Sequence, residues 1–127
     1  PGEMSRLTGL SIDFINDNRI KVAKEFARDN NVVVLLKGYN TVITDGIEVH
    51  VNPTGSSAMA SGGMGDSLTG VIAAFSAQGL RALQCACFSA YIHGYTGDSL
   101  SEDRYSVNAE RLIEEIPCSI KAIQRLL

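Results

Sequence analysis

Apolar positions recur along the first third of the chain with two different spacings. Residues 20–27 carry apolar side chains at helical intervals, with Asn16 or Asp17 as N-cap and Asn30-Asn31 ending the helix. Residues 32–36, VVVLL, form an unbroken, mostly β-branched run. Such a run is typical of a strand covered on both faces, as in a parallel sheet between helix layers. We therefore expect a helix followed by a buried, parallel-type strand.

The pattern then changes to a hairpin and a group of helices. In TVITDGIEVHV, Asp45-Gly46 separates two strand-like runs, which predicts a hairpin with a two-residue turn. Residues 1–9 are expected to form a loop with a short helical turn, and residues 52–65 a loop. Helices are predicted from about Asp66 to Gly79, from Arg81 to Tyr95, and after Ser106 with a break near Pro117.

This order of elements predicts an α/β fold with too few strands to complete a parallel sheet. We expect a single domain over residues 1–127, of which an N-terminal half is missing. Covering the open edge of the 32–36 strand would then favour association into a homo-oligomer.

Composition limits the possible partners. The chain has 127 residues, of which 45% are apolar and 20% charged, with a formal net charge of −3. That charge favours neither nucleic acid nor an anionic membrane surface. The longest apolar runs fall far short of the ~20 residues of a membrane span. The three cysteines, Cys85, Cys87 and Cys118, are expected to be reduced, which indicates a cytoplasmic protein, and the first two to be buried small residues.

The densest chemical signal is SGGMGDSLTG, residues 61–70. Gly62, Gly63 and Gly65 allow positive φ angles and close approach of a ligand to the backbone. A helix is predicted to follow at once, and its first N–H groups are unpaired at the positive end of the dipole. The segment therefore predicts a phosphate site built from main chain.

Asp66 lies where this loop meets the helix, and two interpretations stay open. The carboxylate is either an N-cap that accepts from the N–H of Ser67, Leu68 or Thr69, or a general base beside the phosphate site. A carboxylate repels phosphate, but it suits proton removal from a hydroxyl that takes part in phosphoryl transfer.

Four segments together resemble the ADP/ATP-dependent NAD(P)H-hydrate dehydratase family, which has the ribokinase-like three-layer α/β/α fold. Residues 59–70 resemble its GxGD-type string, and Lys37-Gly38-Tyr39-Asn40-Thr41 resembles its KGxxT segment. Pro1-Gly2-Glu3-Met4 resembles the end of its His-Pro-Gly-Glu motif, without the His. Residues 91–98 resemble its HGxAGD stretch, where His93 and Asp98 are interpreted as packing and helix-terminus residues.

The resemblance implies a site and a reaction. Asp66 would deprotonate the hydroxyl of hydrated NADH or NADPH, which takes the terminal phosphoryl group of ADP or ATP before phosphate leaves. The 62–66 loop, which contains Gly62, Gly63 and Gly65, would contact the moving phosphoryl group through backbone N–H groups. Gly65 and residues 37–41 (Lys37, Gly38, Tyr39, Asn40 and Thr41) would line the nucleotide. Mg²⁺ is expected to bridge the phosphates, with no ligand identifiable.

The chain also departs from the family pattern. Met64 stands where Ser or Thr is usual, and Ser61 replaces a Thr. The length is about half that of family members. Neither His50, Glu114-Glu115 nor Ser67 has neighbours that indicate a metal site, a carboxylate pair or a catalytic triad.

Two alternatives to the dehydratase therefore remain. One is a ribokinase-like small-molecule kinase, of the hydroxyethylthiazole or hydroxymethylpyrimidine type, which would share the loop and Asp66. The other is a non-catalytic fragment that at most binds nucleotide.

Overall fold

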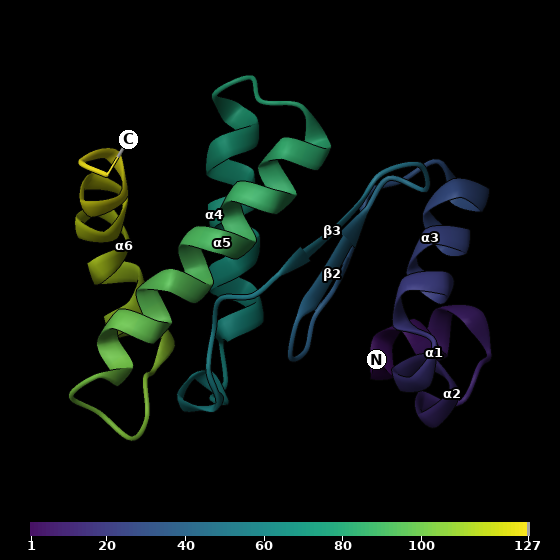
Figure 1. Ribbon diagram of the computed structural model, residues 1–127, viewed down its shortest axis with the longest axis horizontal. Coiled ribbons are helices and arrows are strands. Elements are labelled where there is room, and N and C mark those ends of the chain that lie inside the picture. The colour runs from purple at the N-terminus through teal and green to yellow at the C-terminus, as the bar shows by residue number, and fades with distance from the viewer. Residues whose placement is uncertain (127) are drawn as a thin grey trace. The chain divides into compact units, whose positions relative to one another are not determined.

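The computed structural model describes residues 1–126, which divide into two compact units, Pro1–Pro53 and residues 54–126. Each unit is described by itself. The first holds three helices and a small sheet, and the second holds a short 3-10 turn and three longer helices (Figure 1).

Three helices open the first unit: α1 (Gly2–Thr8), α2 (Ile12–Asp17) and α3 (Arg19–Asn30). The opening segment expected to be mostly loop is thus helical. Asn18 is the N-cap of α3, so the prediction of Asn16 or Asp17 was wrong, because α2 occupies both positions. The predicted end is confirmed, since Asn31 adopts the left-handed conformation with φ of 52°.

The sheet consists of β1 (Val34–Leu36), β2 (Thr41–Thr44) and β3 (Val49–Asn52) in the order β1-β2-β3. Both pairings are antiparallel, with Leu35 opposite Ile43 and Ile43 opposite His50. Within the described chain, the strand expected to be parallel-type therefore has only an antiparallel partner. The reason is the short 37–40 connection, because a parallel partner requires a long crossover.

Helix α3 covers this sheet and forms the core of the first unit with it. The buried side chains of the cluster are Met4, Ile15, Val22, Ala23, Ala27, Val34, Leu36 and Val42. Phe26 and Val49 pack against it. Ile20, which the spacing placed on the inner face, is half exposed.

The predicted hairpin is confirmed as β2 and β3, but its turn is longer than two residues. Thr44 pairs with Val49, so residues 45–48 form the connection. The Oδ1 atom of Asp45 accepts from the N–H of Ile47 at 2.9 Å and of Glu48 at 2.8 Å. The Asp45 side chain thus closes a four-residue loop where a two-residue turn would have used main-chain bonds alone.

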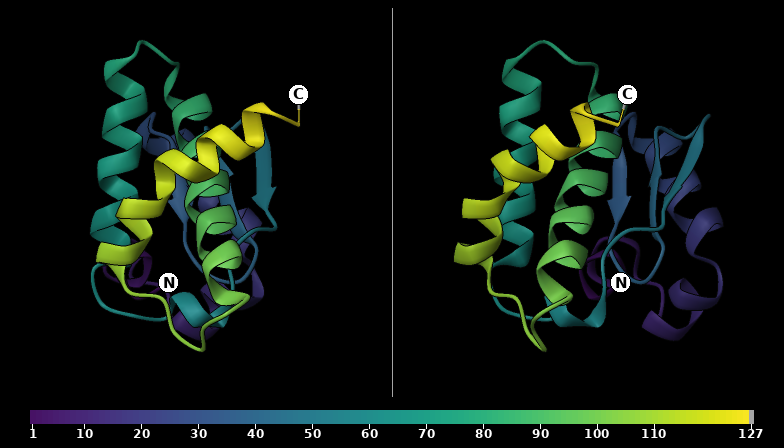
Figure 2. Two further views of the ribbon diagram at one scale, coloured as in Figure 1. Left: turned by 90° about the vertical axis from the view of Figure 1, so that its left-hand side faces the viewer. Right: turned by 60° about the vertical axis from the view of Figure 1, so that its left-hand side comes forward.

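The second unit contains η1 (Ser57–Met59), α4 (Met64–Ala77), α5 (Ala82–Ser101) and α6 (Ala109–Gln124). Helices α4 and α5 pack against each other, and α6 crosses this pair (Figure 2). Helix α5 runs six residues beyond the predicted end at Tyr95. Helix α6 continues through Pro117, where a break was expected.

The structure also bears on two further predictions, the burial of the cysteines and the lack of a membrane-spanning segment. Cys85 is buried as expected, whereas Cys87 is only half-buried and Cys118 is exposed, and none of the three forms a disulfide within residues 1–126. Over residues 1–126, none of the helices combines the length and apolar character that crossing a bilayer requires.

Candidate functional site

The loop before α4 leaves main-chain donors without acceptors. Gly63 is the N-cap of α4, with φ of 84° and ψ of −9°, and no side chain caps this terminus. The N–H of Ser67 bonds to the carbonyl of Gly63 at 2.9 Å. Within residues 1–126, the N–H groups of Met64, Gly65 and Asp66 have no hydrogen-bond acceptor. Three adjacent free donors at the positive end of a 14-residue helix can bind an anion.

Asp66 is the third residue of this helix rather than its cap. The helix begins at Met64, two residues earlier than predicted, and Gly63 takes the capping position. The carboxylate makes no capping hydrogen bond, so the N-cap interpretation of Asp66 was wrong. The residue is exposed, which leaves its carboxylate accessible to a ligand.

Contacts from the α5–α6 connection hold the loop from one side. The Ser61 hydroxyl donates to the carbonyl of Val107 at 2.9 Å, and the N–H of Val107 donates to the carbonyl of Ala58 at 2.9 Å. A Cβ atom built on Gly63 would lie 3.1 Å from the Cβ of Ala109. Ser61 therefore acts in fixing the loop, and Gly63 is required both for its positive φ and for this close approach.

Helix α5 contacts the same region through two side chains. Ser67 Oγ lies 2.9 Å from His93 Nε2, and the N–H of Gly55 donates to Asp98 Oδ2 at 2.8 Å. His93 is buried, in line with the packing interpretation. Asp98 lies inside α5 and not at a helix terminus, so the capping interpretation of Asp98 was wrong.

Residues 37–41 form a turn in the first unit, between β1 and β2. Lys37 and Tyr39 are exposed, and Asn40 has a positive φ of 55°. The Thr41 hydroxyl donates to the carbonyl of Gly38 at 3.0 Å and closes the turn. This turn and the glycine loop belong to different compact units, so the expectation that both line one nucleotide stays a prediction.

Sequence reasoning missed Arg19, which fixes the start of this turn. Its Nη2 donates to the carbonyl of Leu36 at 2.7 Å, while its Nε is buried without a partner. Burial lowers the pKa of Arg19, because desolvation disfavours the charged guanidinium. A basic residue at the start of a helix that precedes a strand was the only available signal, and it is not specific.

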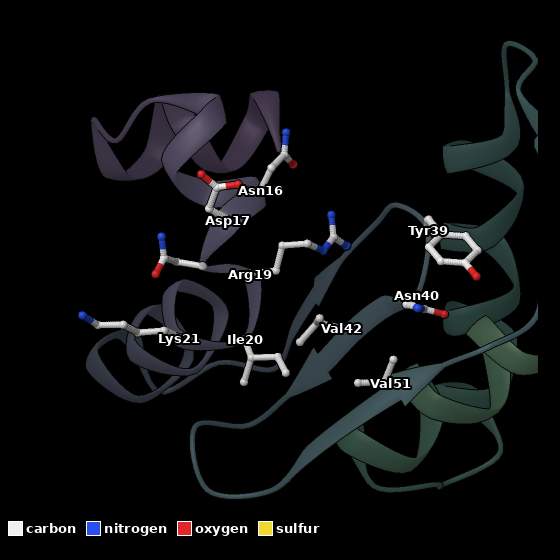
Figure 3. Close-up of a pocket in the computed structure, with 10 residues that line it drawn as sticks. Asn16, Asp17, Arg19, Ile20, Lys21, Tyr39, Asn40, Val42 and Val51 are labelled. Carbon is white, nitrogen blue, oxygen red and sulfur yellow. The ribbon is translucent and has the colours of Figure 1, made fainter.

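Arg19 also lines an open pocket of about 650 Å³ within the first unit. Figure 3 shows its side chain extending from α3 toward the strands, with Tyr39 and Asn40 from the 37–41 turn around the same pocket. Ile20, Val42 and Val51 give it an apolar wall. Tyr39 and Asn40, which were expected to line the nucleotide, therefore border a pocket, and all residues that line this pocket belong to the first unit.

The other candidates have local partners. His50 Nε2 lies 3.4 Å from Glu48 Oε2 on the exposed hairpin, and Arg111 Nη1 lies 3.4 Å from Glu114 Oε2. In the part of the chain that the structure describes, no group of three or more His, Cys, Asp or Glu side chains could hold a metal ion.

Known proteins are similar to this sequence along almost its whole length. A family model described as NAD(P)H-hydrate dehydratase matches residues 1–118. The bifunctional NAD(P)H-hydrate repair enzyme Nnr of Moorella thermoacetica is 40% identical over 128 residues, which cover 98% of this chain and 24% of that protein.

Solved structures show the same similarity in three dimensions. The ADP/ATP-dependent NAD(P)H-hydrate dehydratase of Bacillus subtilis, co-crystallised with ATP and Mg²⁺, superposes with a TM-score of 0.88 at 32% identity. The match covers 96% of this chain and 45% of that one. A ribokinase-like superfamily protein of Enterococcus faecalis gives a TM-score of 0.81 at 29% identity, with 94% and 41% covered. The expected fold, the C-terminal part of a ribokinase-like α/β domain, is confirmed.

Proposed function

Because the chain belongs to the NAD(P)H-hydrate dehydratase family, we propose that it supplies the phosphate-binding loop and the general base of a nucleotide-dependent dehydratase. The substrate would be hydrated NADH or NADPH, and ADP or ATP would donate a phosphoryl group. The chain spans 24% of the Moorella thermoacetica relative and 45% of the Bacillus subtilis structure. The complete reaction therefore needs protein surface beyond the matched region.

The first part of the proposal concerns the phosphate. The free N–H groups of Met64, Gly65 and Asp66 would donate to phosphoryl oxygens, and Gly62 and Gly63 would allow the close approach of the phosphate to the backbone. Main-chain donors fixed before the ligand arrives stabilise the charge of a phosphoryl group in transfer without reorganisation of the protein. Loss of the usual Ser or Thr hydroxyl at Met64 leaves these main-chain donors in place.

The second part concerns the proton. Asp66 carries an exposed carboxylate that is not used as a helix cap, on the same helical turn as the free amides. It would accept the proton of the substrate hydroxyl as that oxygen attacks phosphorus. AMP or ADP would leave as the phosphoryl group is transferred. The phosphorylated hydrate would then lose phosphate from one ring carbon and a proton from the adjacent carbon, which restores the nicotinamide double bond.

The 37–41 turn would contact the nucleotide through Lys37, Gly38, Tyr39, Asn40 and Thr41. Lys37 is exposed and carries a positive charge that suits phosphate oxygens. Mg²⁺ is commonly held by substrate phosphates, water and only one or two carboxylates, so it needs no dedicated protein cage. We assign it no ligand in this chain.

The observation that carries the proposal is the set of free amides at the start of α4 beside the uncommitted carboxylate of Asp66. The first test is calorimetric titration of the chain with ADP and with ATP, with and without Mg²⁺. The second uses a chimera in which this chain replaces the matching region of the Bacillus subtilis enzyme, assayed by recovery of absorbance near 340 nm from hydrated NADH. No binding to the chain and no recovery by a folded chimera would reject the proposal.

The same assays distinguish the two alternatives. A small-alcohol kinase would consume ATP with hydroxyethylthiazole or hydroxymethylpyrimidine and leave a stable phosphorylated product, with no change at 340 nm. A chain that only binds nucleotide would bind ADP, while a folded chimera would remain inactive. Recovery of absorbance that depends on ADP supports the dehydratase over both.

A further inference from the structure

Helix α5 contacts both ends of the segment that contains the glycine loop. This segment, residues 55–67, starts at Gly55, whose N–H bonds to Asp98, and ends at Ser67, whose hydroxyl contacts His93. His93 and Asp98 lie five residues apart on one helix. One rigid element thus touches the loop segment where it enters and where it leaves.

We propose that His93 and Asp98 are positioning residues, which set the conformation of the 55–67 segment without contributing an atom to the phosphate site. The inference that this serves nucleotide binding rests on the proposed function. The positioning itself does not depend on it.

The contact of His93 leads directly to the first residue of α4. Ser67 Oγ has one proton, and it donates to the carbonyl of Met64 at 3.0 Å. At its 2.9 Å contact with His93 Nε2 this arrangement makes the hydroxyl oxygen the acceptor, and it requires the ring tautomer that carries a proton on Nε2. The result is a chain of two hydrogen bonds, from His93 through Ser67 to Met64. His93 and Ser67 are both only 7% exposed, where losing such a bond is costly.

The contact of Asp98 fixes the other end of the segment. Its carboxylate accepts the N–H of Gly55 at 2.8 Å, and the hydroxyl of the adjacent Thr54 donates to the carbonyl of Tyr91 at 3.1 Å. Hydrogen bonds from main-chain N–H groups to a carboxylate are stronger than neutral ones. The segment is therefore held where it leaves the preceding strand.

Two glycines of α5 bring the segment close enough for these bonds to form. A Cβ atom built on Gly94 would lie 2.6 Å from the carbonyl carbon of Thr54, and one built on Gly97 would overlap the side chain of Met59. Real Cβ atoms do not approach other atoms so closely, so a larger residue at position 94 would displace the backbone at Thr54, and one at position 97 would displace the Met59 side chain.

The glycine loop needs this external support because it has little of its own. The N–H groups of Met64, Gly65 and Asp66 have no acceptor within the described residues, so no internal bond fixes their direction. Binding by such donors depends on preorganisation, since disorder in the free state is a cost that the ligand must overcome. Fixed ends at residues 55 and 67 supply that preorganisation.

Amide hydrogen exchange of the chain without ligand is the direct test. In His93→Leu we expect the N–H of Ser67, which bonds to Gly63, to exchange about tenfold faster, as expected for loss of one buried hydrogen bond. In Asp98→Ala the N–H of Gly55 should show the same change. The N–H of Leu112 in α6, bonded to Asn108, serves as control and should keep its rate.

Conservative variants separate positioning from general stability. His93→Gln retains an N–H donor and Asp98→Asn retains an acceptor oxygen, so both should restore most of the protection. If His93→Leu does not fold, Ser67→Ala removes the same contact by deletion of one oxygen. Unchanged exchange at Ser67 and Gly55 overturns the proposal, and so does an equal acceleration at Leu112.

Titration with ADP then tests the link to the proposed function. We expect His93→Leu and Asp98→Ala to raise the Kd for ADP about tenfold, with partial rescue by the conservative variants. If the unaltered chain binds no ADP and a folded chimera gives no recovery of absorbance, while the exchange effects are local, the proposed function fails and the positioning stands. If ADP binds all variants equally, the positioning does not serve the nucleotide, and that part of the proposal is overturned.

Discussion

The guanidinium of Arg19 occupies the space that a side chain on residue 38 would need. A Cβ atom built on Gly38 would lie 2.6 Å from Arg19 Nη1, and Nη2 of the same side chain bonds to the carbonyl of Leu36 at 2.7 Å. Gly38 also has φ of 148°, within the range that L side chains rarely adopt. The first residue of α3 therefore determines how the 37–41 turn leaves β1.

Gly38→Ala should lower the free energy of unfolding by about 1–3 kcal/mol, because φ of 148° is strained for alanine and the new methyl group also forces the Arg19 guanidinium away from Leu36. Urea denaturation measures the change. Gly9→Ala is the comparison, since Gly9 has φ of 74°, a left-handed conformation that strains alanine less, and no atom within 4 Å of the built Cβ. Equal effects of the two substitutions would contradict the prediction.

Asp66→Asn should reduce dehydratase turnover in the chimera by a factor of about 10²–10⁴, the range for loss of a general base. Binding of ADP should not weaken, because the substitution removes a negative charge near the phosphates. Glu110→Gln, in the first turn of α6, is the matched control and should change neither quantity. A drop in ADP affinity with turnover preserved would assign Asp66 to binding instead.

Gly63→Ala should weaken ADP binding, because φ of 84° disfavours alanine and the methyl group would contact Ala109 at 3.1 Å. Calorimetric titration gives the Kd. Gly70→Ala in the same helix offers the comparison, since no atom lies within 4 Å of the built Cβ. That substitution should raise the free energy of unfolding by about 0.5–1 kcal/mol through helix propensity and leave the Kd unchanged.

Asp45 should make the hairpin sensitive to acid. Hydrogen bonds from the N–H groups of Ile47 and Glu48 lower the pKa of its carboxyl below the ordinary value. A folded-state pKa below the unfolded one adds stability above the unfolded pKa, and this contribution is lost as pH falls through the folded pKa. Asp45→Asn keeps an acceptor but removes the carboxylate that is protonated in acid. The urea midpoint of unfolding of this variant should therefore change less below pH 4 than that of the control variant Asp103→Asn, which keeps Asp45 and is altered in an exposed loop.

The chain alone should associate and show negligible dehydration of hydrated NADH. Within the described residues β1 pairs only with β2, so its other edge presents unpaired backbone groups. Gel filtration with light scattering over a range of concentrations measures the association. A monomer at high concentration would contradict it, and rapid turnover abolished by Asp66→Asn would contradict the expected inactivity.

Local signals in the sequence were enough to predict the helix that ends at Asn31, the β2–β3 hairpin and the glycine loop. The errors have physical causes. The helix predicted to end at Tyr95 continues to Ser101, and the missing side chain of Gly97 within it makes room for Met59. The start of α4 at Met64 has no capping side chain to announce it, so Asp66 was taken for the cap.

Contacts between distant residues were beyond sequence reasoning. Arg19 is 17 residues from Leu36, and the spacing of apolar positions says nothing about which carbonyl a basic side chain will reach. The partner of Ser67 was also hidden, because His93 lies 26 residues away on another helix. Motif resemblance identified the residues around the loop but not which of them hold it in place.

The bond between Asp98 and Gly55 closes a stretch of 43 residues, and that between Ser61 and Val107 spans 46. Bringing together residues so far apart in the sequence costs chain entropy, which only the packing of the helices can offset. An ordered anion site should therefore arise late in folding. A bound nucleotide should in turn raise the temperature at which the second unit, residues 54–126, unfolds. At a free concentration one hundred times its Kd, such a ligand would add about 2.7 kcal/mol to the stability of the folded state.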